Sequence, residues 1–403
     1  MRIFFKLNWS MSTERKIAMD DDVLLIKNGI ILDPSRDIRE KMDVAVKDGK
    51  ISGIGNYSNE QTKFMVNAAG CYVTPGLIDH HAHVYPLMRT GIPAEAICFS
   101  SGVTTVVDAG STGHATYENY RAYIQSQTMI DIRPYLNICA TGLATLPYLE
   151  DLNPDRFDEV KIAEIFSRFP GELEGLKIRI SRNIVGKYGI TPLKKTIEIA
   201  DKIGVPVMVH CTNPPCPLED VISCLRPGDI LTHMYQNIGS TLIDPEGKIK
   251  QSVYEARETG VIFEAADARA HFSFEVSEPA IKQGFLPDII ATDLTQFSMN
   301  QRPTSFSMAM QLSKYIDLGI DLYEVIRRCT EIPARVMHQL GTIGSLQPGT
   351  QADIAVFRPI EVENEFGDRP YYMKECSTRE GYLRIKPEMT IKCGKIVYRD
   401  IQF

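Results

Sequence analysis

Short apolar segments alternate with stretches of helical length through the middle of the chain. Each apolar segment has the length of a buried strand and is followed by room for a helix, such as 191–203 after the fourth segment and 277–283 after the seventh. We predict eight strands, at residues 72–78, 104–108, 132–138, 175–181, 205–210, 229–233, 261–264 and 288–293. Eight strand-helix units over about 220 residues predict an α/β fold, a (β/α)8 TIM barrel.

An open doubly wound sheet is the alternative fold for this alternation. Such a sheet carries a glycine-rich phosphate loop after its first strand. The sequence contains no Gly-x-Gly-x-x-Gly and no Walker-type loop. The barrel is therefore the better interpretation.

Both ends of the chain have the pattern of short strands joined by tight turns. Asn28-Gly29, Asp48-Gly49 and Cys393-Gly394 each separate two apolar segments, and such residues tolerate the positive φ of a two-residue hairpin turn. We expect segments 22–73 and 345–403 to form one composite β-sandwich beside a barrel of residues 74–344. Residues 1–21 show no clear period and are expected to be an N-terminal extension, with disorder as one interpretation.

Composition and charge exclude few classes of function. The 403 residues include 44 Lys and Arg against 51 Asp and Glu, a net charge of −7 that does not favour binding to nucleic acid. No stretch approaches the roughly 18 apolar residues of a membrane span. Nine scattered cysteines are typical of reduced thiols, so we expect a cytoplasmic protein without nucleic-acid or membrane partners. The sequence is compatible with a monomer and with a homo-oligomer.

Histidines gather at the predicted strand ends, where barrels of this kind carry their function. His81 and His83 alternate at the end of the first strand and face one side, while His80 faces away. Strands five, six and eight end in His210, His233 and Asp293. One such histidine alone is typical of an ordinary core or surface residue. Five imidazole and carboxylate groups at equivalent strand ends indicate a metal site.

Lys177 adds a feature that a single-metal site would lack. Apolar residues alternate with Lys177 in the fourth strand, so its side chain is expected to point into the barrel. An ammonium group would repel cations there, whereas carboxylation of the amine by CO2 would produce an anion able to bridge two of them. A structural lysine paired with an inward carboxylate is the alternative.

Motifs in the same order resemble those of the amidohydrolase superfamily of binuclear metallohydrolases. They are Pro75-Gly76-Leu77-Ile78-Asp79 before His81-x-His83, Gly102-Val103-Thr104-Thr105, Gly344-Ser345-Leu346-Gln347-Pro348-Gly349 and Ala352-Asp353-Ile354. The segments around Lys177 and His210 resemble the amidohydrolase/deacetylase group, which is related to dihydroorotases. The resemblance covers about residues 22–400.

The resemblance implies a ligand set and a mechanism. His81, His83 and Asp293 would hold one divalent ion, His210 and His233 the other, and carboxylated Lys177 would bridge them. With Zn²⁺ as the expected ion, the two ions would share a hydroxide that attacks the substrate. Asp293 would be the catalytic residue, accepting the hydroxide proton and returning it to the leaving group.

Four further residues are weaker candidates for contact with a small-molecule substrate. Asn213 and Tyr235 follow ligands on loops that would cover the site, and Arg302 could clamp a carboxylate. His271 lies where the family has a Gly-rich His motif, from which Asp267-Ala268-Arg269-Ala270-His271 departs. Each can also be an ordinary polar loop residue.

The leading function is metal-dependent hydrolysis of an amide, cyclic amide or ester of a small acid, with deacetylation first. Ring opening of the dihydroorotase or hydantoinase type is the alternative within the same chemistry. A nucleobase-type deaminase usually works with one metal and no bridging lysine, so Lys177 argues against it. A non-catalytic scaffold relative should have lost ligands, and none is missing.

Overall fold

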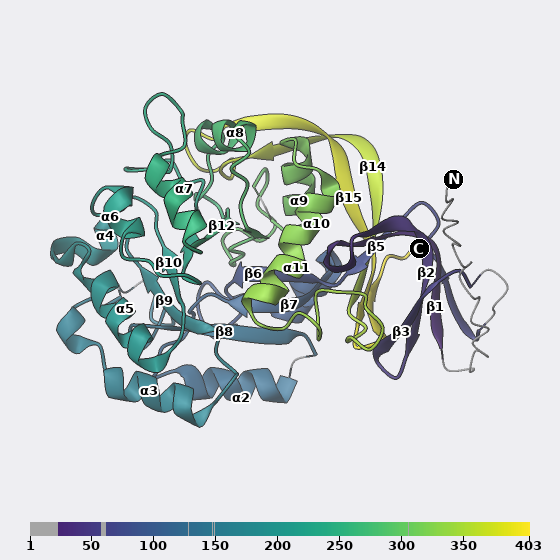
Figure 1. The fold of residues 1–403 in the computed structure, drawn as a ribbon, viewed down its shortest axis with the longest axis horizontal. Coiled ribbons are helices and arrows are strands. Elements are labelled where there is room, and N and C mark those ends of the chain that lie inside the picture. The colour runs from purple at the N-terminus through teal and green to yellow at the C-terminus, as the bar shows by residue number, and fades with distance from the viewer. Residues whose placement is uncertain (1–22, 58–61, 128, 147, 149, 305) are drawn as a thin grey trace, which may run out of the picture.

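A barrel of eight parallel strands is the centre of the molecule (Figure 1). The computed structural model describes residues 23–57, 62–127, 129–146, 148, 150–304 and 306–403, so the expected extension 1–21 lies outside them. The barrel strands follow chain order, and each is hydrogen-bonded to the next. They are β6 (Leu77–Ala82), β7 (Val103–Asp108), β8 (Asp131–Asn137), β9 (Gly175–Arg179), β10 (Val207–His210), β11 (Ile230–Thr232), β12 (Ile262–Ala266) and β13 (Ile289–Ala291).

The barrel is nearly closed through the ends of its first and last strands. Ala82 forms an isolated parallel bridge with Leu294, just beyond β13. The amide of His83 donates to the Leu294 carbonyl at 3.0 Å, and the amide of Asp293 donates to the His81 carbonyl at 2.6 Å. These bonds bring the last predicted ligand beside the first two.

The prediction that residues 72–78 form a single strand is wrong. The chain changes sheet at Gly76: β5 (Tyr72–Pro75) pairs in the terminal sheet, and β6 begins the barrel. A Cβ at Gly76 would lie 2.2 Å from Thr104 Oγ1, so the crossing needs glycine. The other seven predicted barrel strands begin and end within two residues of the observed ones.

Helices surround the barrel and connect its strands (Figure 1). The predicted helix 191–203 is confirmed as α5, with Pro192 in its first turn and Gly204 at φ 79 after its last. The α-helices are α1 (Ala94–Cys98), α2 (Tyr117–Gln127), α3 (Glu159–Arg168), α4 (Arg182–Val185), α5 (Thr191–Ile203), α6 (Leu218–Ile222), α7 (Gln251–Glu258), α8 (Phe274–Lys282), α9 (Met308–Asp317), α10 (Leu322–Cys329) and α11 (Glu331–Val336). Short 3-10 helices occupy Pro34–Arg36, Phe99–Ser101, Pro154–Arg156 and Gly186–Tyr188.

The two ends of the chain build a second, separate sheet, as the fold prediction requires. Its order is β16-β15-β14-β5-β1-β2-β3, with β4 also paired to β1. The strands are β1 (Leu24–Asp33), β2 (Ile38–Lys47), β3 (Lys50–Gly55), β4 (Phe64–Asn67), β14 (Ile354–Gly367), β15 (Thr378–Lys392) and β16 (Lys395–Arg399). Apolar side chains of both segments share one core. The division into domains at residues 73 and 345 stays a prediction.

Two of the three predicted hairpin turns are confirmed. Asp48-Gly49 and Cys393-Gly394 connect paired strands, and all four residues have positive φ. The turn at Asn28-Gly29 is wrong, because β1 runs through it as one strand. Asn28, at φ 66, marks an irregularity in the pairing of β1 with β2 and not a reversal of the chain.

The β14–β15 ribbon is much longer than the sequence pattern indicates. In Figure 1 it extends from the terminal sheet over α8 and α9. The Ile385 amide donates to Ser313 Oγ of α9 at 2.9 Å, and Arg379 pairs with Glu278 of α8 at 2.7 Å. The terminal sheet therefore supports helices that follow the last barrel strands. Within the described segments, no helix is both long and apolar enough to cross a membrane.

Candidate active site

A cavity of about 540 Å³ is lined by residues at the C-terminal ends of the barrel strands. It brings together most of the side chains that the sequence singled out. Those that line it are His81, His83, Lys177, His210, His271 and Asp293. His80 is fully buried and does not line the cavity, but its Nδ1 contacts Glu264, the same carboxylate that His81 contacts. The pairing of β6 with β7 is irregular between Asp79 and Ala82, so simple alternation does not describe this strand end.

His81 is oriented by a buried carboxylate from β12. Its Nδ1 lies 2.7 Å from Glu264 Oε1 and 3.1 Å from Thr232 Oγ1. The other oxygen of Glu264 lies 2.7 Å from His80 Nδ1. Because a carboxylate only accepts hydrogen bonds, His81 donates through Nδ1, and its Nε2 carries the lone pair that can bind a cation.

His83 is oriented in the same way from β7. Its Nδ1 lies 3.1 Å from Ser111 Oγ, which donates to Asp108 Oδ2 at 2.8 Å. Nε2 of His83 is directed at Asp293, with 3.3 Å to Oδ1. Both histidines of the first strand thus present Nε2 to the cavity.

Asp293 lies opposite these two nitrogens. Its backbone has φ 51, a left-handed conformation that turns the side chain in after β13. Oδ1 lies 3.6 Å from His81 Nε2. Burial alone would raise the pKa of this carboxyl, but the adjacent His83 and the other nearby imidazoles lower the pKa to about 2. Asp293 is therefore ionised at neutral pH.

Lys177 points into the barrel from β9, as its place in the strand predicted. It is 1% exposed, and its Nζ lies 3.4 Å from His81 Nε2. Burial lowers the pKa of Lys177 to about 8, although Glu264 and Asp293 counteract the shift. Within the described chain, no carboxylate lies within ion-pair distance of Nζ, so the alternative of a structural, paired lysine is not supported.

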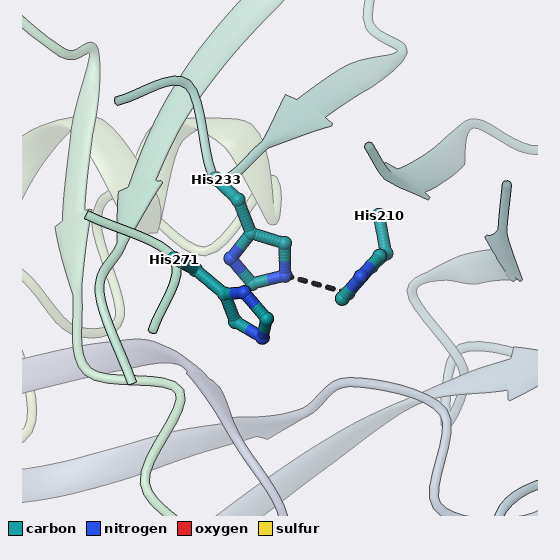
Figure 2. A group of neighbouring side chains, drawn as sticks. All are labelled: His210, His233 and His271. Atoms are coloured by element: carbon teal, nitrogen blue, oxygen red, sulfur yellow. Dashed lines mark hydrogen bonds between the residues drawn. The ribbon is translucent and has the colours of Figure 1, made fainter. Parts of the chain in front are cut away.

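His210 and His233 form a second group beside the first. Thr212 Oγ1 lies 3.0 Å from His210 Nε2, and the Ala266 carbonyl lies 2.6 Å from His233 Nδ1. The remaining nitrogens, His210 Nδ1 and His233 Nε2, face each other at 2.8 Å (Figure 2). Burial lowers the pKa of both rings well below the usual value, which keeps them in the neutral form that binds metal.

The donor atoms fit divalent cations. Tetrahedral zinc with bonds of 2.0–2.1 Å places neighbouring ligand atoms about 3.3 Å apart. Asp293 Oδ1 lies 3.6 Å from His81 Nε2 and 3.3 Å from His83 Nε2, close to that spacing. His81, His233 and Asp293 form one compact donor group, and His210, His233 and His271 form another.

Three of the weaker candidates lie elsewhere than the sequence predicts. Tyr235 is fully buried and donates to the Phe285 carbonyl at 3.2 Å, because the chain turns inward after His233 at φ 65. Arg302 lines a separate cavity of about 350 Å³ between α9 and β15. The backbone amide of Asn213 donates to Gln236 Oε1 at 3.3 Å. Asn213 does not line the cavity.

Several site residues escaped sequence reasoning. Glu264 is an acidic residue inside an apolar strand, and this contrast could have identified it as a candidate site residue. The cavity is also lined by Arg89, Arg179 and Arg269, which come from different loops and strand ends. Arg179 is paired with Glu150 at 2.9 Å, whereas Arg89 and Arg269 have no acidic partner among the described residues and flank the Phe297 ring. Arg179 shares the inward face of β9 with Lys177, so the alternation of that strand marks it, whereas no local pattern marks Arg89 or Arg269.

Comparison with known proteins agrees with this geometry. Residues 72–396 match the amidohydrolase family. A deacetylase of Brucella anthropi is 33% identical over 328 residues, which cover 80% of each chain. A solved adenine deaminase has a TM-score of 0.85 at 28% identity, covering 94% of this chain and 100% of its own. A solved dihydroorotase has a TM-score of 0.84 at 27% identity, covering 94% and 98%. The chain thus belongs to the amidohydrolase family and is a metal-dependent hydrolase of that family.

Proposed function

We propose that the protein is a binuclear metallohydrolase that removes an acyl group, most simply acetyl, from an amide or ester of a small acid. The observation that supports two ions is Lys177, which is buried against His81 in the cavity that His83 and His210 also line. The similarity to a deacetylase over most of the chain supports the acyl group. The product acid and the released amine or alcohol follow from the addition of one water.

The residues divide into two ligand groups with one shared bridge. His81, His83 and Asp293 would hold one ion, His210 and His233 the other, and carboxylated Lys177 would lie between them. Zn²⁺ suits this set of nitrogen and oxygen donors. When bound, such ions lower the pKa of a coordinated water and polarise the scissile carbonyl.

The environment of Lys177 supports carboxylation. Only the neutral amine reacts with CO2, and a pKa of about 8 leaves about a tenth of it neutral at pH 7. An amine with the ordinary pKa would be neutral in only about 0.03% of molecules. The nearby carboxylates Glu264 and Asp293 would oppose the negative charge of a carbamate, so the bound cations would have to compensate for it.

Asp293 is the general base and acid of the proposal. Its carboxylate is ionised and lies beside both ligand groups, so it can accept the proton of the attacking water. It then returns this proton to the leaving nitrogen or oxygen. Without that return the leaving group would depart as an anion of high pKa, which is slow.

The charge of the cavity supports an acidic substrate. Arg89, Arg179 and Arg269 line it, and Asp293 is the carboxylate among its lining residues. Because Glu150 already pairs with Arg179, the unpaired Arg89 and Arg269 are the proposed contacts for a carboxylate. This replaces Arg302 in that role.

The test is an assay of enzyme loaded with Zn²⁺ in the presence of bicarbonate. N-acetyl amino acids, O-acetyl hydroxy acids, dihydroorotate, hydantoins and adenine are compared at equal concentration. We expect turnover of the acetylated acids. Turnover of dihydroorotate alone would replace deacetylation by ring opening, which the similarity to a solved dihydroorotase makes the second candidate. Release of ammonia from adenine alone would indicate a deaminase.

Asp293→Asn tests the catalytic role within that assay. The amide keeps an oxygen for the metal but accepts a proton poorly, so we expect near-normal metal content and a loss of about 10²–10⁴-fold in kcat. Arg302→Gln, outside the cavity, is the control and should retain activity. Full turnover by Asp293→Asn would remove Asp293 from the role.

A further inference from the structure

We propose that His271 is a third imidazole ligand of the metal ion that His210 and His233 hold. The inference rests on the proposed binuclear centre and adds one ligand to it. This ligand lies in a loop, whereas the predicted histidine and aspartate ligands lie at strand ends. It assigns to the unusual loop after β12 a role in metal binding.

The three rings lie together on one side of the cavity. Figure 2 shows His271 beside His233, with His210 facing His233 across their hydrogen bond. The ring centre of His271 lies 5.0 Å from that of His210 and 4.4 Å from that of His233. One ligand nitrogen from each ring lies within 4.8 Å of the other two, which is close enough for one ion after small rotations.

The hydrogen bonds distinguish His271 from its neighbours. His210 and His233 each use their outer nitrogen on the protein, through Thr212 and the Ala266 carbonyl. Neither ring nitrogen of His271 has a hydrogen-bond partner within the described part of the chain: Nδ1 is buried and unpartnered, and Nε2 lies 3.7 Å from Asp293 Oδ2. A neutral imidazole with a nitrogen free toward the cavity is what a metal ligand requires.

The backbone on both sides of His271 is fixed. Its amide donates to the Asp267 carbonyl at 3.0 Å. The Asp267 carboxylate binds Lys314 Nζ at 2.8 Å and the Tyr315 hydroxyl at 3.0 Å, both on α9. Lys314 also lies over the Phe272 ring, 3.1 Å from its centre. His271 is therefore held in the cavity before any ion binds, which lowers the entropic cost of coordination.

Cobalt substitution tests the proposal without using activity as the only readout. Metal-free enzyme is titrated with Co²⁺ in bicarbonate buffer, and hyperfine-shifted imidazole N–H resonances are counted by proton NMR. We expect five resonances, from His81, His83, His210, His233 and His271, because each ring keeps one protonated nitrogen. Four resonances would overturn the role of His271 and leave the binuclear centre intact. Failure to bind cobalt at all would overturn the proposed function itself.

A matched pair of variants gives a second readout. In His271→Ala we expect one of two cobalt equivalents to bind at least about tenfold more weakly, since even the loss of a group that only orients a ligand costs 10–100-fold. Added free imidazole should restore the visible spectrum. Arg269→Ala, in the same loop, should bind both equivalents as the unsubstituted enzyme does. Unchanged binding and spectrum in His271→Ala would overturn the proposal that His271 is a metal ligand.

Discussion

Glu264 contacts two consecutive histidines with its two carboxylate oxygens. One oxygen orients His81, whose Nε2 faces the cavity, and the other accepts from His80, which does not line the cavity. His83 is oriented by a different pair, Ser111 and Asp108. At the scale of single residues, the metal site therefore depends on partners that do not touch the cavity themselves.

Glu264→Gln should weaken metal binding. The amide has one acceptor oxygen, so it can accept from only one of the two imidazoles and presents an N–H to the other. We expect metal affinity to fall about 10–100-fold, measured by equilibrium dialysis with Zn²⁺. Glu258→Gln, at an exposed position on α7, is the control. An affinity equal to that of the unsubstituted enzyme would mean that His81 keeps its orientation without the carboxylate.

Helix α9 connects the terminal sheet to the loop that carries His271. Its outer side contacts β15 through Ser313, and Lys314 and Tyr315 bind Asp267 at the end of β12. The ion pair between Lys314 and Asp267 is buried, with side chains 1% and 2% exposed. At the scale of elements, this pair joins the helix layer to the loop of the site.

Lys314→Met should destabilise the fold, because it leaves the Asp267 carboxylate buried without its cation. Removal of one partner of a buried pair costs about 3–5 kcal/mol of unfolding free energy, measured here by urea denaturation. Adding Asp267→Asn should recover part of the loss, since the uncompensated charge is then absent. Lys161→Met breaks an exposed pair with Glu164 and should cost far less than Lys314→Met, because water screens the pair. A similarly small loss for Lys314→Met would contradict the role of the pair.

The barrel assembles the proposed ligands from strand ends that are far apart in the chain. Hydrogen bonds of Asp293 with His81, and of His83 with Leu294, join the last strand to the first at the site itself. An ion held by both would add a further connection between these ends. At the scale of the whole molecule, metal binding and barrel closure should therefore stabilise each other.

Removal of metal by a chelator should lower the melting temperature. A ligand that binds only the folded state adds about 4 kcal/mol when present at a thousand times its Kd. Calorimetry of enzyme with and without chelator measures the difference. A variant carrying both His81→Ala and His83→Ala should melt at a temperature that responds much less to chelation. Equal melting temperatures for the loaded and stripped enzyme would contradict metal binding to the native fold.

Some of the site was readable from sequence because its rules are local. Alternation in a strand places His81, His83 and Lys177 on the inner side, and strand order in a barrel places His210, His233 and Asp293 near them. The prediction that Tyr235 covers the site is wrong because His233 has a left-handed backbone conformation, which changes the direction of the side chains that follow it. The pattern of apolar and polar residues does not predict such a change in backbone conformation.

The sequence alone determined the barrel, the composite sheet of both ends and the set of polar groups at the strand ends. These follow from periodicity and chain order, which act over neighbouring residues. The tertiary structure decided which groups orient them: Glu264, Ser111, Asp108 and the anchored loop of His271 come from separate strands and loops. Their contacts depend on how packed elements meet in space, and no short segment of sequence contains that information.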